Sequence, residues 1–249
     1  MNTILKASSP FFFLLGLSIL RPQLIYGSEI QFETIDQIEK NFENVKWELV
    51  QKSQGIEVKR KKIGKDSILA LKATGVLNTS VEKIISIFKE TNLAYQWAPG
   101  LKERRILQEI SETEAVVYDI HQMPWPCQDR DLVIYNKIEL IQKRKQIALI
   151  SSSIETYSKD PGSNGNVRAE LYYSFIGLTP ISQNKTKVEF FIHVNPKGSI
   201  PNWIINYILK TRPSGFLKAI EKRSNSMEPK IGPVTRKMVE ALKLLLKKK

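Results

Sequence analysis

Apolar and polar residues alternate with a period of two through most of the middle of the chain. Turn residues bound each alternating run, and the links between most runs are only a few residues long. Links this short favour antiparallel pairing, because parallel strands need long crossover connections. The pattern predicts strands over residues 56–61, 67–76, 104–110, 115–123, 132–141, 146–154, 167–178 and 186–194.

Apolar residues recur at helical spacing in three other segments. One helix is predicted over residues 34–46, and a second begins after a cap at Thr79 or Ser80. A third, much longer helix begins near Ser199, and Pro213 inside it predicts a kink or a brief break. The three apolar faces consist of Ile35, Ile38, Phe42 and Val45; of Val81, Ile84, Ile85 and Phe88; and of Ile200, Trp203, Ile204, Tyr207, Ile208, Phe216, Leu217 and Ile220.

This order of elements predicts an α+β fold, in which helices cover one side of a curved antiparallel sheet. The chain has 249 residues, of which 42% are hydrophobic, enough for a large core without covalent staples. The single cysteine, Cys127, excludes an internal disulfide framework, and two histidines do not suggest a histidine-rich metal centre. We therefore expect neither a metal nor a cofactor.

The first 27 residues have the pattern of an export signal. Lys6 precedes an uncharged apolar run over residues 11–20, which is too short to span a bilayer and suits the hydrophobic region of a signal peptide. Gly27 fits the last position before a cleavage site, although Ile25, two residues earlier, is larger than the small residue preferred at that position. We expect a signal peptide over residues 1–27 and a periplasmic or secreted protein, with an uncleaved membrane anchor as the alternative.

The C-terminal segment, residues 229–249, is set apart by Pro229, Gly232 and Pro233. It predicts a basic amphipathic helix with Pro233 in its first turn. Such a helix either lies on anionic lipid or packs on its own domain with its lysines in water. Its apolar positions are Val234, Met238, Leu242 and Leu245, and its basic positions include Arg236, Lys237, Lys243 and residues 247–249.

The formal net charge of +13 is compatible with a nucleic-acid partner, with an anionic membrane surface, or with solubility alone. The basic residues are scattered over residues 59–62, 104–105, 143–145 and the C-terminal tail, and no predicted helix carries a recognition stripe. Together with the export signal, this scatter argues against a nucleic-acid partner.

Several short motifs follow one another at characteristic spacing. Trp47 and the run 55–58 (GIEV) precede Tyr95-Gln96-Trp97, and Pro124-Trp125-Pro126 precedes Asp129-Arg130-Asp131. Residues 167–170 (VRAE) and 195–206 (NPKGSIPNWIIN) follow. In this order the motifs resemble the START family, the steroidogenic-acute-regulatory-protein-related lipid-transfer domains. The resemblance covers residues 30–225, inside a predicted domain over residues 28–228.

The resemblance implies a helix-grip fold, in which the sheet wraps around the long C-terminal helix. It also implies an apolar tunnel between sheet and helix that holds one lipid or sterol-like ligand. On the helix, we expect Trp203, Tyr207 and Phe216 to face the tunnel, with ordinary core packing as the alternative.

Polar residues inside such a tunnel would orient the ligand. Asp119 and His121 share one face of a predicted strand, and the family often carries an acid there with a basic partner on the next strand. Arg130 matches the family's Arg-Asp motif. Asn136 stands where some relatives carry a cavity arginine, which favours a neutral polar contact over a buried ion pair. We expect His121 to face the ligand, with a purely structural role as the alternative.

The turn Lys143-Arg144-Lys145 falls at the hairpin that, in the family, helps to cover the tunnel mouth. We expect it to meet anionic membrane surfaces transiently, unless it is only a soluble charged turn.

An enzyme of the same broad fold, a cyclase or hydrolase acting on a hydrophobic substrate, is the alternative function. The sequence contains no nucleophile elbow, phosphate-binding glycine loop or zinc motif, and Cys127 with His121 makes a weak pair. We therefore expect a non-enzymatic, monomeric lipid-binding protein.

Overall fold

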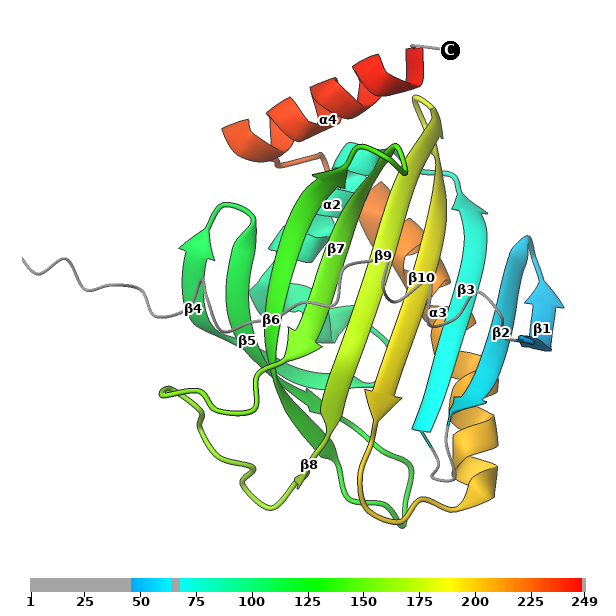
Figure 1. Cartoon of the computed structure of the whole chain (residues 1–249), viewed down its shortest axis with the longest axis vertical. Coiled ribbons are helices and arrows are strands. Elements are labelled where there is room, and N and C mark those ends of the chain that lie inside the picture. Colours follow the sequence, from blue (N-terminus) through cyan, green and yellow to red (C-terminus); the bar gives the residue numbers. More distant parts are fainter. Residues whose placement is uncertain (1–45, 64–67, 248–249) are drawn as a thin grey trace, which may run out of the picture. The chain divides into compact units, whose positions relative to one another are not determined.

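A curved antiparallel sheet dominates the structure, a computed structural model that describes residues 46–63 and 68–247. Within these residues the sheet has ten strands in the order β1-β2-β3-β10-β9-β7-β6-β5-β4, with the short β8 beside β6 (Figure 1). The strands are β1 (Glu48–Ser53), β2 (Ile56–Ile63), β3 (Ile68–Leu77), β4 (Leu101–Ser111), β5 (Glu114–His121), β6 (Arg130–Ile141), β7 (Gln146–Ser153), β8 (Val167–Arg168), β9 (Glu170–Ser182) and β10 (Lys185–Asn195).

The predicted strands and their antiparallel pairing are confirmed, with two differences. β1 was not predicted, and the strand expected over residues 167–178 is divided into β8 and β9. β8 is the one described strand that pairs in parallel, with Arg130 and Asp131 of β6. The predicted segments 1–27 and 34–45 lie outside the described residues.

In the described part of the chain, four helical segments accompany the sheet: α2 (Val81–Lys89), the 3₁₀ helix η1 (Thr91–Gln96), α3 (Asn202–Asn225) and α4 (Pro233–Lys247). The predicted cap of α2 is Ser80, whose hydroxyl accepts a hydrogen bond from the Lys83 amide at 3.3 Å. The assigned helix α3 continues through Pro213, so the break that the proline suggested is absent. None of these helices is both long enough and apolar enough to cross a bilayer.

α3 lies behind the sheet and buries Ile204, Leu209, Leu217 and Ile220 (Figure 1). The main core forms between this helix, α2, α4 and the inner face of the sheet. The cavity described below adjoins this core, and Ile176, Phe190 and Phe216 belong to both.

The apolar face of α4 packs on its own domain, which is one of the two alternatives expected for the C-terminal segment. Val239 and Leu242 are buried in the main core, and Lys243 Nζ lies 2.6 Å from Glu82 Oε1. The helix N-terminus is held by Glu112, in the turn between β4 and β5. Its carboxylate accepts hydrogen bonds from the Val234 amide and from the amide and hydroxyl of Thr235, at 2.9, 2.9 and 2.7 Å.

This arrangement keeps Glu112 ionised. Burial alone would raise the pKa of its carboxyl, but the hydrogen bonds from Thr235 and Val234 and the nearby Lys89 ammonium outweigh it and lower the pKa to about 2. A negative charge at a helix N-terminus also interacts favourably with the helix dipole. Gly232 leaves room for this contact, because a Cβ there would overlap the Glu112 carboxylate and displace it from the helix N-terminus.

We predict that Glu112→Ala lowers the unfolding free energy by about 2 kcal/mol, the upper range for loss of a helix cap. Glu112→Gln, which keeps the size but not the charge, should lose about half as much. Hydrogen exchange is the measurement: amide protection should fall most in α4, and the amides of β9 and β10 should lose no more than the change in unfolding free energy. A uniform change over the whole domain, or no change in α4, would contradict this role.

Candidate functional site

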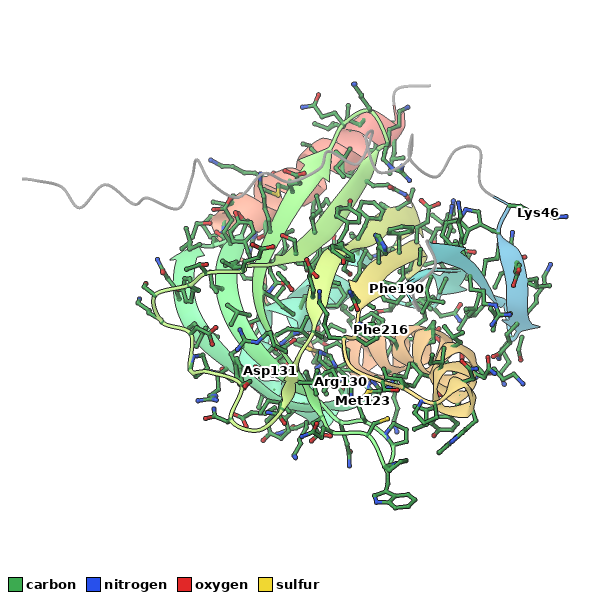
Figure 2. The ribbon with its side chains drawn as sticks, turned by 60° about the horizontal axis from the view of Figure 1, so that its bottom comes forward. Lys46, Met123, Arg130, Asp131, Phe190 and Phe216 are labelled. Atoms are coloured by element: carbon green, nitrogen blue, oxygen red, sulfur yellow. The ribbon has the colours of Figure 1, made fainter. Side chains whose placement is uncertain are left out.

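The candidate site is a cavity of about 330 Å³ between the inner face of the sheet and α3. Its wall is mostly aliphatic and aromatic, and the ring of Phe216 lies 5.2 Å from Phe190 and 6.2 Å from Trp97, centroid to centroid. Figure 2 shows Phe190 and Phe216 where the sheet meets α3. Lining residues come from every layer around it, among them Leu71, Leu101, Leu132, Ile134, Leu149, Leu171, Ile176, Ile192, Ile205 and Leu209.

A buried ion pair forms the main polar feature of this wall. Arg104 on β4 faces Asp119 on β5 in the sheet register. Its guanidinium donates from Nε to Asp119 Oδ1 at 2.6 Å and from Nη2 to Oδ2 at 2.5 Å. The Asp119 side chain is 0% exposed, and His121 Nε2, two residues further along the same strand, lies 3.6 Å from Asp119 Oδ2.

The electrostatics of the pair follow from this geometry. Burial alone would raise the pKa of Asp119, but the adjacent Arg104, assisted by His121, outweighs it and lowers the pKa to about 2. Asp119 is therefore a carboxylate at neutral pH, and Arg104 is its counter-ion. The expectation that Asn136 replaces a buried ion pair is thus wrong: the pair exists, but its cation comes from the preceding strand.

Asn136 and Arg130 both line the cavity, in different ways. Asn136 Oδ1 accepts a hydrogen bond from Ser151 Oγ on β7 at 2.6 Å, the kind of neutral contact that was expected. Arg130 is buried and donates to three backbone carbonyls, those of Pro196, Gln128 and Lys197. It therefore joins the β5–β6 loop to the segment that enters α3.

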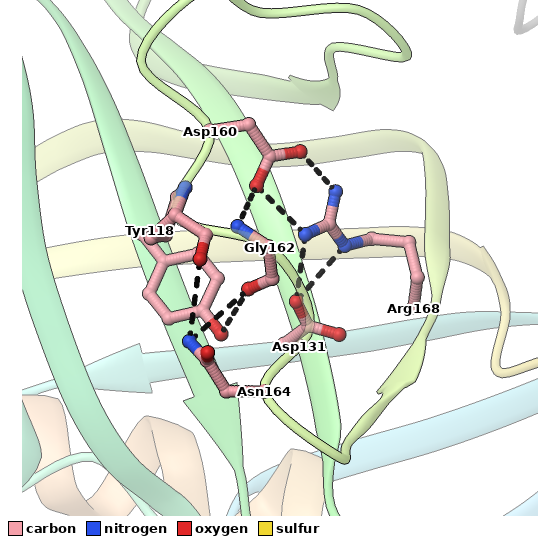
Figure 3. Close-up of polar contacts among 7 residues, drawn as sticks. Tyr118, Asp131, Asp160, Gly162, Asn164 and Arg168 are labelled. Atoms are coloured by element: carbon pink, nitrogen blue, oxygen red, sulfur yellow. Dashed lines mark hydrogen bonds and ion pairs between the residues drawn. The ribbon is translucent and has the colours of Figure 1, made fainter.

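Asp131, the next residue, points to the opposite face, because successive residues of a strand alternate. Its carboxylate accepts from Arg168 Nε at 2.9 Å, and Arg168 also pairs with Asp160, Nη1 to Oδ2, at 2.6 Å (Figure 3). The Tyr118 hydroxyl donates to the Gly162 carbonyl at 3.2 Å. These contacts fasten the loop between β7 and β8 to the outer face, so the Arg130-Asp131 motif supports both sides of the sheet.

Of the three α3 residues predicted to face the cavity, only one does so. Phe216 lines the cavity as expected. Trp203 and Tyr207 do not: their side chains are 58% and 54% exposed, and the expectation that they face the cavity is wrong. The helix is rotated so that Ile205, Ile208 and Leu209 face the cavity instead. Side-chain size alone does not report this rotation.

The turn Lys143-Arg144-Lys145 connects β6 to β7 next to α4 (Figure 1). It does not line the cavity: the last residue of β6 that does so is Asn136, and the strand continues to Ile141 before the turn. Arg144 is also engaged, with Nε 3.0 Å from Gln146 Oε1 and its guanidinium over the Phe175 ring.

Two cavity arginines, Arg104 and Arg212, are absent from the residues predicted from sequence. Arg104 interrupts the apolar side of β4, and its position opposite Asp119 depends on a register that three irregularities along the β4–β5 ladder set. Arg212 stands beside Pro213 in the apolar pattern of α3. A basic residue on an otherwise apolar helix face was the available signal.

A curved antiparallel sheet wrapped around a long C-terminal helix, with an apolar cavity between them, defines the helix-grip fold. The chain belongs to the START domain family, whose sequence model matches residues 29–230. Phosphatidylcholine transfer protein from Bos taurus is 27% identical over 178 residues, covering 71% of this chain and 83% of its own. Ceramide transfer protein from Mus musculus is 24% identical over 195 residues, covering 69% of this chain and 30% of its own.

Solved structures support the same fold. Human StAR-related lipid transfer protein 5 superposes with a TM-score of 0.67 at 16% identity, over 77% of this chain and 92% of its own. A StAR-related lipid transfer protein from Xanthomonas axonopodis gives 0.62 at 24% identity, over 72% of this chain and 98% of its own.

Proposed function

We propose that this protein binds one lipid or sterol-like molecule in the cavity and carries it between membranes without changing it chemically. The observation that carries the proposal is the mostly apolar cavity whose wall contains the buried ion pair of Arg104 and Asp119, with His121 beside it. An apolar ligand gains roughly 25 cal/mol for each Å² that leaves water, while a few polar groups set its orientation. The named transfer proteins among the relatives support the same assignment.

Two observations favour a carrier over an enzyme. The Asp119 carboxylate is bound by Arg104, so it is poorly placed to take up a proton from a substrate. Cys127 does not line the cavity, although His121 does. A cyclase or hydrolase would need a general acid or base in the cavity, and His121 is the candidate for it. Turnover of a hydrophobic substrate that His121→Gln abolishes would favour that alternative.

Ligand entry needs an opening, and the segments around Arg130 suggest where it forms. Arg130 joins the β5–β6 loop to the α3 entry by hydrogen bonds alone. Exposed aromatic residues stand in the same segments as lining residues: Trp125 between Met123 and Arg130, and Trp203 between Ile200 and Ile205. Tryptophan favours the interface between lipid and water, so this end of the domain would face the membrane. Transient contact of Lys143, Arg144 and Lys145 with anionic lipid, export directed by residues 1–27 and a monomeric state remain part of the proposal.

The direct test is native mass spectrometry of the purified chain, followed by transfer of a fluorescent lipid between two vesicle populations. A co-purified lipid together with catalysed transfer is expected. A protein that carries no lipid and takes none up on titration would overturn the proposal.

We predict that Trp125→Ser with Trp203→Ser weakens association with phosphatidylcholine vesicles about tenfold, or 1.4 kcal/mol. The control is Leu49→Ser, which removes an exposed apolar side chain from β1. Lys143→Glu with Lys145→Glu should instead weaken association only with vesicles that contain phosphatidylglycerol, since each basic residue contributes about 1 kcal/mol near an anionic surface. Vesicle sedimentation measures both. Unchanged association of the tryptophan variant would place the membrane contact elsewhere.

A further inference from the structure

The charges that line the cavity do not balance. Among the described residues that line it, three arginines, Arg104, Arg130 and Arg212, stand against one carboxylate, Asp119. In an apolar surrounding of low dielectric constant, an uncompensated charge exerts a much stronger field than it does in water. The partners of each arginine therefore decide what charge the cavity attracts.

Two of the three arginines donate several hydrogen bonds to the protein. Arg104 is neutralised by Asp119 through two parallel hydrogen bonds. Arg130 keeps its charge but directs all three guanidinium nitrogens at backbone carbonyls, which hold it within the wall. Arg104 therefore has a carboxylate as its counter-ion, and Arg130 has a backbone acceptor for each of its guanidinium nitrogens.

Arg212 is different. Its Nη2 donates to the Gln122 carbonyl, at the end of β5, and this is its one hydrogen bond to the described part of the chain. It forms no ion pair with any described residue; Asp129, the carboxylate that acts on it through space, is bonded to Lys102 Nζ at 2.8 Å. Burial lowers the pKa of Arg212 from its ordinary value, as expected for a cation that has lost part of its hydration, although an arginine remains charged at any physiological pH.

The backbone around Arg212 is shaped to admit the guanidinium. Gly100, which precedes β4, has φ +77°, and a Cβ at this residue would lie 2.7 Å from Arg212 Cζ. Gly100 O also accepts a hydrogen bond from the Gln122 amide at 2.8 Å. This bond joins the two backbone segments that contact the guanidinium. Arg212 is thus held in place at the cavity wall, beyond His121, with most of its N–H donors directed at no described residue.

We propose that Arg212 binds the anionic group of an amphiphile whose apolar part fills the cavity. This inference rests on the proposed function and names the ligand class: a carboxylate, sulfate, sulfonate or phosphate group joined to one apolar body. Guanidinium groups suit such anions because their donors lie in one plane and match two oxygens at once. The excess of positive charge over the single carboxylate gives the selectivity for anionic over neutral ligands.

The test uses two fluorescent probes that share one skeleton: anilinonaphthalene sulfonate, and N-phenylnaphthylamine, which lacks the sulfonate. The whole chain should bind the sulfonate more tightly than the neutral parent. Arg212→Gln should weaken sulfonate binding about tenfold, and leave the affinity for the parent within about twofold. Arg212→Lys, which keeps the charge, should restore part of the loss. The matched control is Lys210→Gln on the exposed side of α3, which removes the same charge and should change neither affinity.

The outcomes separate the inference from the proposed function. If neither probe binds and no lipid co-purifies, the proposed function fails. If the parent binds, but Arg212→Gln weakens both probes equally or neither, Arg212 is structural and the inference is overturned. A loss of sulfonate binding in Lys210→Gln as large as that in Arg212→Gln would also overturn it, because general surface charge would then explain the preference. Thermal unfolding of each variant confirms that the folded protein is being compared.

Discussion

Replacing Leu149 and Ile192 together by tryptophan is expected to abolish ligand binding, with affinity falling at least about a hundredfold, or 2.8 kcal/mol. Both side chains line the cavity, Leu149 from β7 and Ile192 from β10. Tryptophan buries roughly 150–250 Å² of its own surface, so it would take contact area that the ligand needs. At roughly 25 cal/mol per Å² this area is worth several kcal/mol. Titration with a fluorescent lipid measures the loss.

The matched control is Leu49→Trp with Ile181→Trp, the same two substitutions at exposed positions of β1 and β9. It should leave binding unchanged. If the cavity variant, still folded by circular dichroism, binds as tightly as the control, then the ligand does not occupy this cavity. Added volume in a packed interior costs about 1–3 kcal/mol of stability, so folding must be checked first.

Asp119→Asn is expected to destabilise the protein by about 3–5 kcal/mol, the usual cost of leaving one charge of a buried pair without its partner. For a domain of this size, the melting temperature should fall by roughly 10 °C. The destabilised group is Arg104, whose two hydrogen bonds would face a neutral amide. The double variant Arg104→Gln with Asp119→Asn should recover much of the loss, because no charge then remains. Chemical unfolding of the wild type, Asp119→Asn, Arg104→Gln and the double variant closes the cycle.

The pH dependence gives an independent check on the same pair. The pKa of Asp119 is about 2 in the folded protein and lies below its ordinary value of 3.8. Its contribution to stability is therefore complete above about pH 4 and is lost as the pH falls toward 2. Glu112 acts in the same direction, so the wild type should lose stability steeply in this range. The double variant should lose less. Equal slopes would mean that the pair contributes nothing to folding.

The sequence predicted the sheet well because its signals are local. Alternation located the strands, short links indicated antiparallel pairing, and Ser80 marked the start of α2. Motif order identified the family, which periodicity alone could not do. β1 was missed because its residues are half exposed and carry little alternation.

The candidate site was predicted only in part, because it depends on register and helix rotation. Asp119, His121, Arg130, Asn136 and Phe216 line the cavity as expected. The partner of Asp119 is fixed by irregularities in the β4–β5 ladder, and these leave no mark in the sequence. On α3, Trp203 and Tyr207 were chosen for size, whereas the structure turns smaller aliphatic side chains inward.

Glu112 has a consequence for where the protein ends as a folding unit. The family's sequence model stops at residue 230, before α4 begins at Pro233. Yet the side chain that holds α4 belongs to the β4–β5 turn, deep inside that model, and Val239 and Leu242 share one core with Ile84 and Ile147. The end of the matched family region and the end of the packed core are therefore different, and a fragment cut at residue 230 would lack core residues Val239 and Leu242.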